Sequence, residues 1–302
     1  MKVNILFYSM NRYILNIYRK PIYIILCIFL SIFFSKLSYS EDNNIKNGEY
    51  ISILGGCYSC HTGDNSNELF AGGRAIITDF GVFYSPNITP DKTTGIGNWS
   101  DADFINAFRR GISPDGYHYL PVFPYTSYTG IRDEDLLNLK KYLFSLKPIN
   151  KVNKSHEVFF IFKINFIKLI WKKLFFLEKE FQFNNKYSKK WNRGNYIVNH
   201  LAHCGECHTP RNLFGASLNK KFLIGSNSSA IGEKSPNITG DLDIGIGSWT
   251  PEEFTDFMLN GIKPDFDNVQ GSMDEVIMHS TSKFDFADII SIYEYLKTIK
   301  IN

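Results

Sequence analysis

The chain of 302 residues is poor in methionine and cysteine, with five of each, and carries little excess of either charge sign. A net charge of +3 is too small for a nucleic-acid-binding chain, so no nucleic-acid partner is expected. With 44% apolar and 16% aromatic residues, the sequence is no disordered or collagen-like polymer, and its length allows about two ordinary domains. Strand-like alternation of apolar and polar residues is also scarce, which favours an all-α fold.

Residues 1–40 contain five basic residues and no acidic one, and residues 22–34 form one apolar run behind Arg19 and Lys20. Small residues follow before Glu41, which is the pattern of a secretory signal peptide. The alternative is an uncleaved anchor, but thirteen residues at about 1.5 Å each are shorter than a ~30 Å hydrocarbon core. We therefore expect export to the periplasm with cleavage of 1–40.

The chain contains an internal repeat. Residues 85–115 align without a gap on residues 235–265, and fifteen of the thirty-one positions are identical. The similarity extends to both sides, so the chain reads as a duplicated unit of about 100 residues, the size of a small domain. The predicted domains are 41–150 and 194–302, with a linker over 151–193.

Each repeat carries a helix-start pattern after Gly-Ile-Gly-x-Trp. The two capping boxes are Ser100 with Asp103 and Thr250 with Glu253. A glycine, Gly111 or Gly261, lies where each of these helices is expected to end. Two further helices are expected in each repeat, one before the cysteine pair and one at the end of the repeat, packed across one another.

The pattern Cys-x-x-Cys-His occurs once in each repeat, which is the signature of c-type haem attachment. Two thiols one helical turn apart can add to the two vinyl groups of haem, and the adjacent imidazole then lies under the iron. The sequence predicts two covalently bound haems c, held by Cys57, Cys60 and His61 and by Cys204, Cys207 and His208. The alternatives are one four-cysteine zinc site or two redox disulfides, and neither explains the histidine after both pairs.

The motifs around these sites resemble those of the cytochrome c subunits of membrane-bound alcohol, sorbitol and gluconate dehydrogenases. They are Cys-x-x-Cys-His-Thr, Ala-Gly-Gly, Ser-Pro-Asn-Ile-Thr, Gly-Ile-Gly-x-Trp and Pro-x-x-Pro-Tyr, between about residues 47 and 300. The resemblance implies two tandem class I cytochrome c domains. It also implies a dehydrogenase catalytic subunit as electron donor and quinone or a terminal oxidase as acceptor. Members of the family often have three haem domains, whereas this chain has two.

The second axial ligand is expected to differ between the two haems. In the second repeat Met273 lies where the family places its axial methionine, with Met278 as the alternative and Met258 as a core residue. The repeat offset places Phe123 at the matching position of the first repeat, and no methionine occurs between residues 41 and 150. A phenylalanine cannot bind iron.

His118 is the nearest substitute ligand for the first haem, and His156 is a weaker one. His118 can equally be a surface loop residue, which would leave the first iron open as a ligand-binding or peroxidatic site. Three other histidines, His200, His203 and His279, are expected to be hydrogen-bonded polar residues without a ligand role. Arg74 and Arg211 are candidates for pairing with haem propionates.

The linker contains a basic, aromatic-rich stretch over residues 158–177. As a helix it would place Ile164, Ile167, Trp171 and Leu174 on one face, with Lys168 and Lys172 on another. Such a helix fits a membrane surface or a partner groove, or it packs between the two repeats. Contact with lipid would associate the chain with the inner membrane.

The sequence thus predicts an electron-transfer subunit that relays single electrons and catalyses no bond chemistry. The competing class is an enzyme or ligand binder that uses an open first haem. A third alternative keeps the relay but makes the chain the partner of a terminal oxidase.

Overall fold

The computed structural model describes residues 41–63, 67–227 and 233–301. The predicted signal peptide over 1–40 lies outside the described residues. The chain divides into two units, Met1–Lys46 and Asn47–Asn302. In the first unit the described residues 41–46 are helical.

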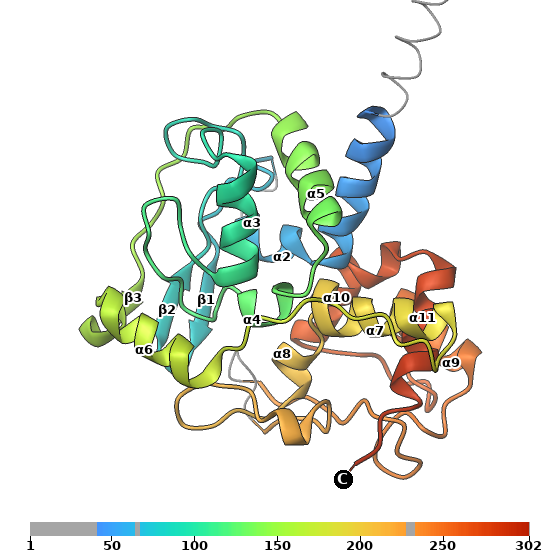
Figure 1. Ribbon diagram of the computed structural model, residues 1–302. Helices are drawn as coiled ribbons and strands as arrows, with labels where there is room; N and C mark the ends of the chain where they lie inside the picture. The colour runs from blue at the N-terminus through green and yellow to red at the C-terminus, as the bar shows by residue number, and fades with distance from the viewer. Residues whose placement is uncertain (1–40, 64–66, 228–232, 302) are drawn as a thin grey trace, which may run out of the picture. The chain divides into compact units, whose positions relative to one another are not determined.

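The first repeat begins with a helix that ends at residue 54, directly before the first cysteine pair (Figure 1). The elements that follow are α2 (Cys57–His61), β1 (Ala75–Thr78), β2 (Gly81–Tyr84), α3 (Asp101–Arg110), α4 (Tyr125–Tyr128) and α5 (Asp133–Ser145). The connecting segment contains β3 (Glu157–Val158), the 3₁₀ turn η1 (Phe160–Lys163) and α6 (Asn165–Phe175).

The second repeat has the same order of helices. It begins with α7 (Lys189–Tyr196), which runs into the π-helical turn η2 (Ile197–Leu201). The remaining elements are α8 (Gly205–His208), η3 (Asn219–Lys221), α9 (Pro251–Asn260), α10 (Ser272–His279), η4 (Thr281–Lys283) and α11 (Phe286–Leu296).

The predicted capping boxes are confirmed in α3 and α9. Asp103 N–H donates to Ser100 Oγ (3.1 Å), while Ser100 N–H donates back to the Asp103 carboxylate (2.9 Å). Thr250 and Glu253 form the same pair in α9. Gly111 and Gly261 end the two helices in the left-handed conformation, with φ values of 59° and 75°.

In each repeat the helix before the cysteine pair crosses the last helix of that repeat at a glycine, as the sequence predicts. A Cβ atom built on Gly48 would lie 1.9 Å from the carbonyl oxygen of Asn138 in α5. A Cβ atom on Gly194 would lie at the same distance from the carbonyl oxygen of Ser291 in α11. No side chain fits at either position, so the two backbones of each crossing are in direct contact.

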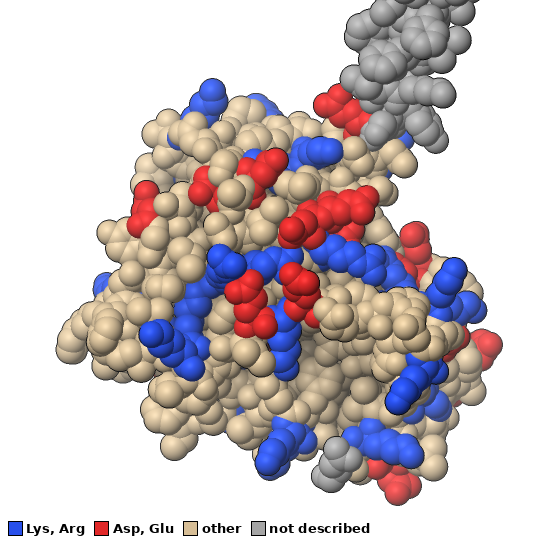
Figure 2. Space-filling model, viewed as in Figure 1, with Lys and Arg blue, Asp and Glu red and all other residues tan. Residues whose placement is uncertain are grey.

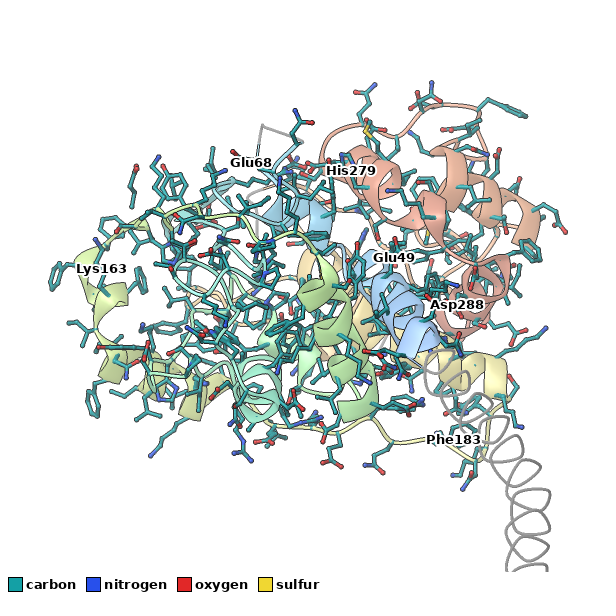
Figure 3. All side chains as sticks on the ribbon, turned by 90° about the horizontal axis from the view of Figure 1, so that it is seen from above. Glu49, Glu68, Lys163, Phe183, His279 and Asp288 are labelled. Carbon is teal, nitrogen blue, oxygen red and sulfur yellow. The ribbon has the colours of Figure 1, made fainter. Side chains whose placement is uncertain are left out.

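Paired tyrosines join the two repeats reciprocally. Tyr50 of the first repeat donates its hydroxyl hydrogen to Asp288 at the start of α11 (2.9 Å). Tyr196, the equivalent residue of the second repeat, donates to Asp135 at the start of α5 (2.6 Å). In Figure 3, Asp288 lies beside the helix that carries Glu49, the residue before Tyr50. Each repeat therefore offers its first helix to the last helix of the other, as in an isologous contact.

The buried side chains of both repeats belong to one continuous core. Leu54 and Leu139 of the first repeat and Leu201 and Ile289 of the second are all nearly inaccessible to solvent. The division into domains over 41–150 and 194–302 stays a prediction from the sequence repeat.

The all-α expectation is wrong in one respect, because the first repeat carries a three-stranded antiparallel sheet in the order β1-β2-β3. Ala75 pairs with Tyr84 and Thr78 with Gly81 across a tight hairpin. Gly81 has a φ of 120°, and a Cβ atom there would lie 2.4 Å from the Glu157 carbonyl oxygen. The strands escape sequence analysis because they are only two to four residues long and β3 comes from the distant linker.

The helix predicted over 158–177 is shorter than expected, since β3 and η1 occupy its first part. Packing of this helix between the two repeats stays a prediction. Of its expected apolar face, Ile167 and Trp171 are partly buried, and Trp171 Nε1 donates to the Phe214 carbonyl oxygen of the second repeat. Leu174 is 69% exposed, whereas Lys172 is only 7% exposed and lies against the end of α3. Among the described residues no helix is both long enough and apolar enough to cross a membrane.

We expect Gly194→Ala to lower the free energy of unfolding by about 3 kcal/mol, since the added methyl group overlaps the Ser291 carbonyl and the helices must separate. Gly116→Ala is the control, because that glycine has a φ of 77° and open space around it, so the cost is the backbone strain of about 1 kcal/mol. Urea unfolding of the haem-loaded protein gives both values. Equal losses for the two variants would contradict the close crossing.

Asp103→Asn should lower stability by about 0.5 kcal/mol at neutral pH, because the carboxylate caps α3. The Ser100 hydroxyl and backbone N–H lower the pKa of Asp103 from its ordinary value. The difference in free energy of unfolding between wild type and Asp103→Asn is therefore fully present above the ordinary pKa of aspartate, about 3.9. It disappears as the pH falls through the lowered pKa that Asp103 has in the folded protein. Urea unfolding between pH 7 and pH 2.5 measures it. A difference that stayed constant over this range would rule out a role for the charge.

Candidate haem attachment sites

The first Cys-x-x-Cys-His motif forms α2, so Cys57 and Cys60 lie one helical turn apart with His61 at the end of the helix. Gly56, in the left-handed conformation with a φ of 59°, turns the chain into this helix from the one that ends at residue 54. The His61 ring donates its Nδ1 hydrogen to the carbonyl oxygen of Pro86 at 2.9 Å. Pro86 belongs to the repeated Ser-Pro-Asn-Ile-Thr block.

The second motif repeats this geometry. Cys204 directly precedes α8, which carries Cys207 and ends at His208. His208 Nδ1 donates to the carbonyl oxygen of Pro236 at 2.8 Å, and Pro236 is the proline of the second Ser-Pro-Asn-Ile-Thr block. Sequence analysis noted both blocks and missed the role of their prolines. Their recurrence 25 residues after His61 and 28 residues after His208 was the available signal.

Both histidines are prepared to bind a metal ion through Nε2. A carbonyl oxygen can only accept a hydrogen bond, so the ring hydrogen is on Nδ1 and the lone pair is on Nε2. Desolvation lowers the pKa of His61 and of His208, which keeps both rings neutral at neutral pH. A backbone carbonyl in this position also fixes the orientation of the ring.

The four cysteines of the two motifs form no disulfide with one another. Desolvation raises the pKa of Cys57 and of Cys204 to about 12, so these thiols remain protonated at neutral pH. In the described ranges no three histidine, cysteine or acidic side chains are close enough to hold a metal ion together. The donor set of each motif, two thiols and one oriented imidazole, fits a covalently attached haem.

An apolar cavity adjoins Cys57. Its walls come from both repeats and consist of Ile51, Gly55, Cys57, Phe108, Tyr128, Ile131, Leu139 and Leu201. The cavity holds only about 10 Å³, so its meaning is that aliphatic and aromatic side chains surround the Cys57 thiol.

Phe123 packs next to this cavity. Its ring makes edge contacts with Phe108 (5.2 Å between centroids), Tyr119 (5.7 Å) and Tyr128 (5.6 Å). Phe108 and Tyr128 line the cavity beside Cys57, so Phe123 is separated from it by one layer of side chains. The position that matches Met273 in the repeat is therefore filled by an aromatic cluster.

His118 is held by the connecting segment. Its backbone N–H donates to Asn165 Oδ1 at 2.7 Å, and its ring Nδ1 lies 3.1 Å from the Lys172 ammonium nitrogen. An ammonium group can only donate, so Nδ1 accepts and the hydrogen of the neutral ring is on Nε2. His118 as an iron ligand stays a prediction, and it requires this arrangement to change. His156 also accepts a hydrogen bond, from Tyr84 N–H.

The three methionines of the second repeat differ in exposure. Met258 is buried in the core on α9, as predicted. Met278 is 59% exposed on α10, whereas Met273 is partly buried in the first turn of the same helix, after Gly271. Met273 remains the predicted ligand of the second haem, and the exposure of Met278 weakens that alternative.

The two attachment segments contact one another through His203, the residue before Cys204. Its ring Nε2 donates to the carbonyl oxygen of Gly55, two residues before Cys57, at 3.4 Å. The His203 ring also packs edge-on against Tyr128, 5.3 Å between centroids. His203 is a hydrogen-bonded polar residue, as expected, but its place between the two motifs was not predicted.

Glu206, between the cysteines of the second motif, ties that motif to the first repeat. It is buried and accepts hydrogen bonds from Thr126 Oγ1 (3.1 Å) and Ser127 Oγ (2.6 Å) of α4. Burial alone would raise the pKa of Glu206, but the Arg211 guanidinium and the Ser127 hydroxyl lower it overall. Arg211 thus pairs with a protein carboxylate, and Arg74 likewise pairs with Glu275.

Comparison with known proteins finds relatives over most of the chain. A c-type di-haem cytochrome of Cereibacter sphaeroides is 37% identical over 83% of this chain and 84% of its own length. The fructose dehydrogenase cytochrome subunit of Gluconobacter japonicus is 38% identical over 85% of this chain. The gluconate 2-dehydrogenase cytochrome c subunit of Pantoea cypripedii is 34% identical over 86%.

The chain spans about half of the fructose dehydrogenase subunit (52%) and 60% of the gluconate dehydrogenase subunit. A scan against protein-family models finds no match. The identity to the Cereibacter protein over nearly its whole length agrees with the two Cys-x-x-Cys-His sites and their oriented histidines. The chain therefore belongs to the family of di-haem c-type cytochromes.

Proposed function

We propose that the chain is a periplasmic di-haem electron carrier that passes single electrons between its two haems. The contact that carries this proposal is the hydrogen bond from His203 to Gly55, which joins the two attachment segments (3.4 Å). Haems attached to Cys57 and Cys204 would therefore be bound to segments that lie next to one another. The apolar side chains beside Cys57 would exclude water from that side of the first haem.

The residues of each motif have separate roles in this proposal. Cys57 and Cys60 would hold the first haem through thioether bonds, and Cys204 and Cys207 the second. Bound haem supplies reversible one-electron chemistry. His61 and His208 would bind the iron through Nε2, with Pro86 and Pro236 fixing the rings. Met273 would complete the second site, and its thioether would raise the potential of that haem.

The partners follow from the relatives. Three of the relatives are named as the cytochrome subunits of fructose, gluconate and alcohol dehydrogenases. We therefore propose a dehydrogenase catalytic subunit as donor and quinone or a terminal oxidase as acceptor. Co-purification with a dehydrogenase rather than an oxidase would distinguish this role from that of an oxidase partner.

A second candidate function is supported by Phe123. This side chain has no lone pair for iron, and His118 Nδ1 already accepts a hydrogen bond from Lys172. A first haem with His61 as its only protein ligand would bind a small ligand such as carbon monoxide or peroxide on its open face. The same chain could then carry electrons through the second haem.

We expect two haems per chain. Cys57→Ser/Cys60→Ser should leave one haem, and Cys204→Ser/Cys207→Ser should leave the other, because each thiol pair attaches its own group. A pyridine haemochrome assay with protein quantification gives the ratio. One haem in the wild type, or none in either double variant, would contradict two separate attachment sites.

Carbon monoxide should bind to about half of the reduced haem, because only the first site lacks a methionine ligand. Phe123→Met should abolish this binding and increase the long-wavelength absorption band of Met-ligated ferric haem. Met273→Ala should do the reverse and open both haems. A CO difference spectrum measures all three proteins. If wild type bound no carbon monoxide, a firm substitute ligand would be present, and His118→Ala would be tested next.

A further inference from the structure

The helix α6 turns one row of apolar side chains outward and the Lys172 ammonium group inward. Phe166 is 66% exposed, Ile170 39%, Leu174 69% and Leu177, just past the helix, 68%. The spacing of four residues between Phe166, Ile170 and Leu174 places these three on one helical face. A helix on the surface of a globular protein normally turns this face to the core.

Polar contacts hold the inner side of α6. The buried Lys172 ammonium donates to the carbonyl oxygen of Gly111 (3.2 Å) and to that of Arg110, at the end of α3. Near the other end of the helix, Asn165 accepts the backbone N–H of His118 (2.7 Å). These hydrogen bonds satisfy the Lys172 ammonium and the Asn165 side chain, which would be costly to bury without partners. They therefore hold α6 in the orientation in which its apolar face is exposed.

The apolar surface continues on both sides of α6. Phe159 and Phe160 precede the helix and are 68% and 78% exposed. On the other side, the Phe175 ring stacks on Phe214 of the second repeat (5.7 Å between centroids), and Trp171 Nε1 donates to the Phe214 carbonyl oxygen (2.8 Å). We call this set of residues the α6 surface; it comprises Phe159, Phe160, Phe166, Ile170, Leu174, Leu177 and Phe214.

The charges within residues 158–177 are of one sign, and the two adjoining acidic residues, Glu157 and Glu178, pair with Lys154 and Arg110. Residues 158–177 contain four lysines and no acidic residue, and Lys163 and Lys173 are exposed. Lys163 lies at the outer edge of the molecule in Figure 3. Figure 2 shows the region of α6 as tan surface interrupted by blue side chains. An apolar surface flanked by cations is complementary to a phospholipid bilayer, which has an apolar interior and anionic headgroups.

The composition favours lipid over a protein partner. Protein interfaces are enriched in arginine and depleted in lysine, whereas residues 158–177 contain four lysines and no arginine. Lysine together with tryptophan, phenylalanine and leucine is typical of helices that lie in the membrane interface. A contiguous exposed apolar patch of this kind marks an interaction site rather than ordinary surface.

We propose that the α6 surface is a peripheral membrane-binding site that inserts its apolar side chains into the headgroup region of an anionic phospholipid bilayer. Lys163 and Lys173 pair with the lipid phosphates. The site deepens the proposed electron-carrier function by holding the haems at the membrane, where a quinone acceptor would be. Binding itself needs no electron transfer, so the two proposals can fail separately.

The test is sedimentation of the exported, haem-loaded protein with vesicles of equal parts phosphatidylglycerol and phosphatidylcholine. Phe166→Ser/Leu174→Ser should reduce vesicle binding at least about tenfold, since two exposed apolar side chains no longer enter the lipid. Leu242→Ser/Ile244→Ser is the matched control. Leu242 and Ile244 are 69% and 66% exposed but lie between α8 and α9, so binding should be unchanged.

Lys163→Gln and Lys173→Gln should each weaken binding to the anionic vesicles by about fivefold, and this loss should disappear in pure phosphatidylcholine. Circular dichroism and the haem spectrum establish that every variant is folded. The proposal is overturned if wild type fails to bind the anionic vesicles, which leaves a protein as occupant of the α6 surface. It is overturned equally if Phe166→Ser/Leu174→Ser binds like wild type.

Discussion

The contact on which the rest of the structure depends is the crossing of two helices at a glycine in each repeat. At Gly48 and at Gly194 the opposing backbone carbonyl occupies the place where a Cβ atom would lie. The crossing fixes the position of the helix that leads into the cysteine pair. It therefore also positions the two thiols and the histidine that follow this helix. It directs the tyrosine two residues later, Tyr50 or Tyr196, toward the last helix of the other repeat.

That reciprocal exchange explains why residues 47–302 form one unit. Two copies of one small fold would each bury a modest core, and joining them through their first and last helices makes the core continuous. The same contact brings His203 to Gly55, so the two attachment segments are neighbours although their histidines are far apart in sequence. The duplicated chain thus contains a contact between its two attachment segments that a single copy would lack.

The two repeats differ in their predicted iron ligands and in the elements that surround the two haem attachment motifs. The second has Met273 and the charged pair of Glu206 and Arg211 beside its motif. The first has an aromatic cluster around Phe123 and a small sheet, and the connecting segment adds α6 with its exposed apolar side chains. These additions lie on loops and on the connecting segment, where changes leave the helix crossings intact.

The sequence by itself determined the features that local chemistry encodes. The duplication, the capping boxes, both Cys-x-x-Cys-His motifs and the family follow from residues close together in the chain, because helix caps and haem attachment depend on spacings of three or four residues. Tertiary structure alone decided the carbonyl partners of His61 and His208, the place of His203 between the repeats, and the strand that residues 157–158 add to the first-repeat hairpin. It also decided which side of α6 faces outward. An amphipathic pattern fixes two faces but not which one is buried, and that choice depended on the carbonyl groups at the end of α3 that the Lys172 ammonium could reach.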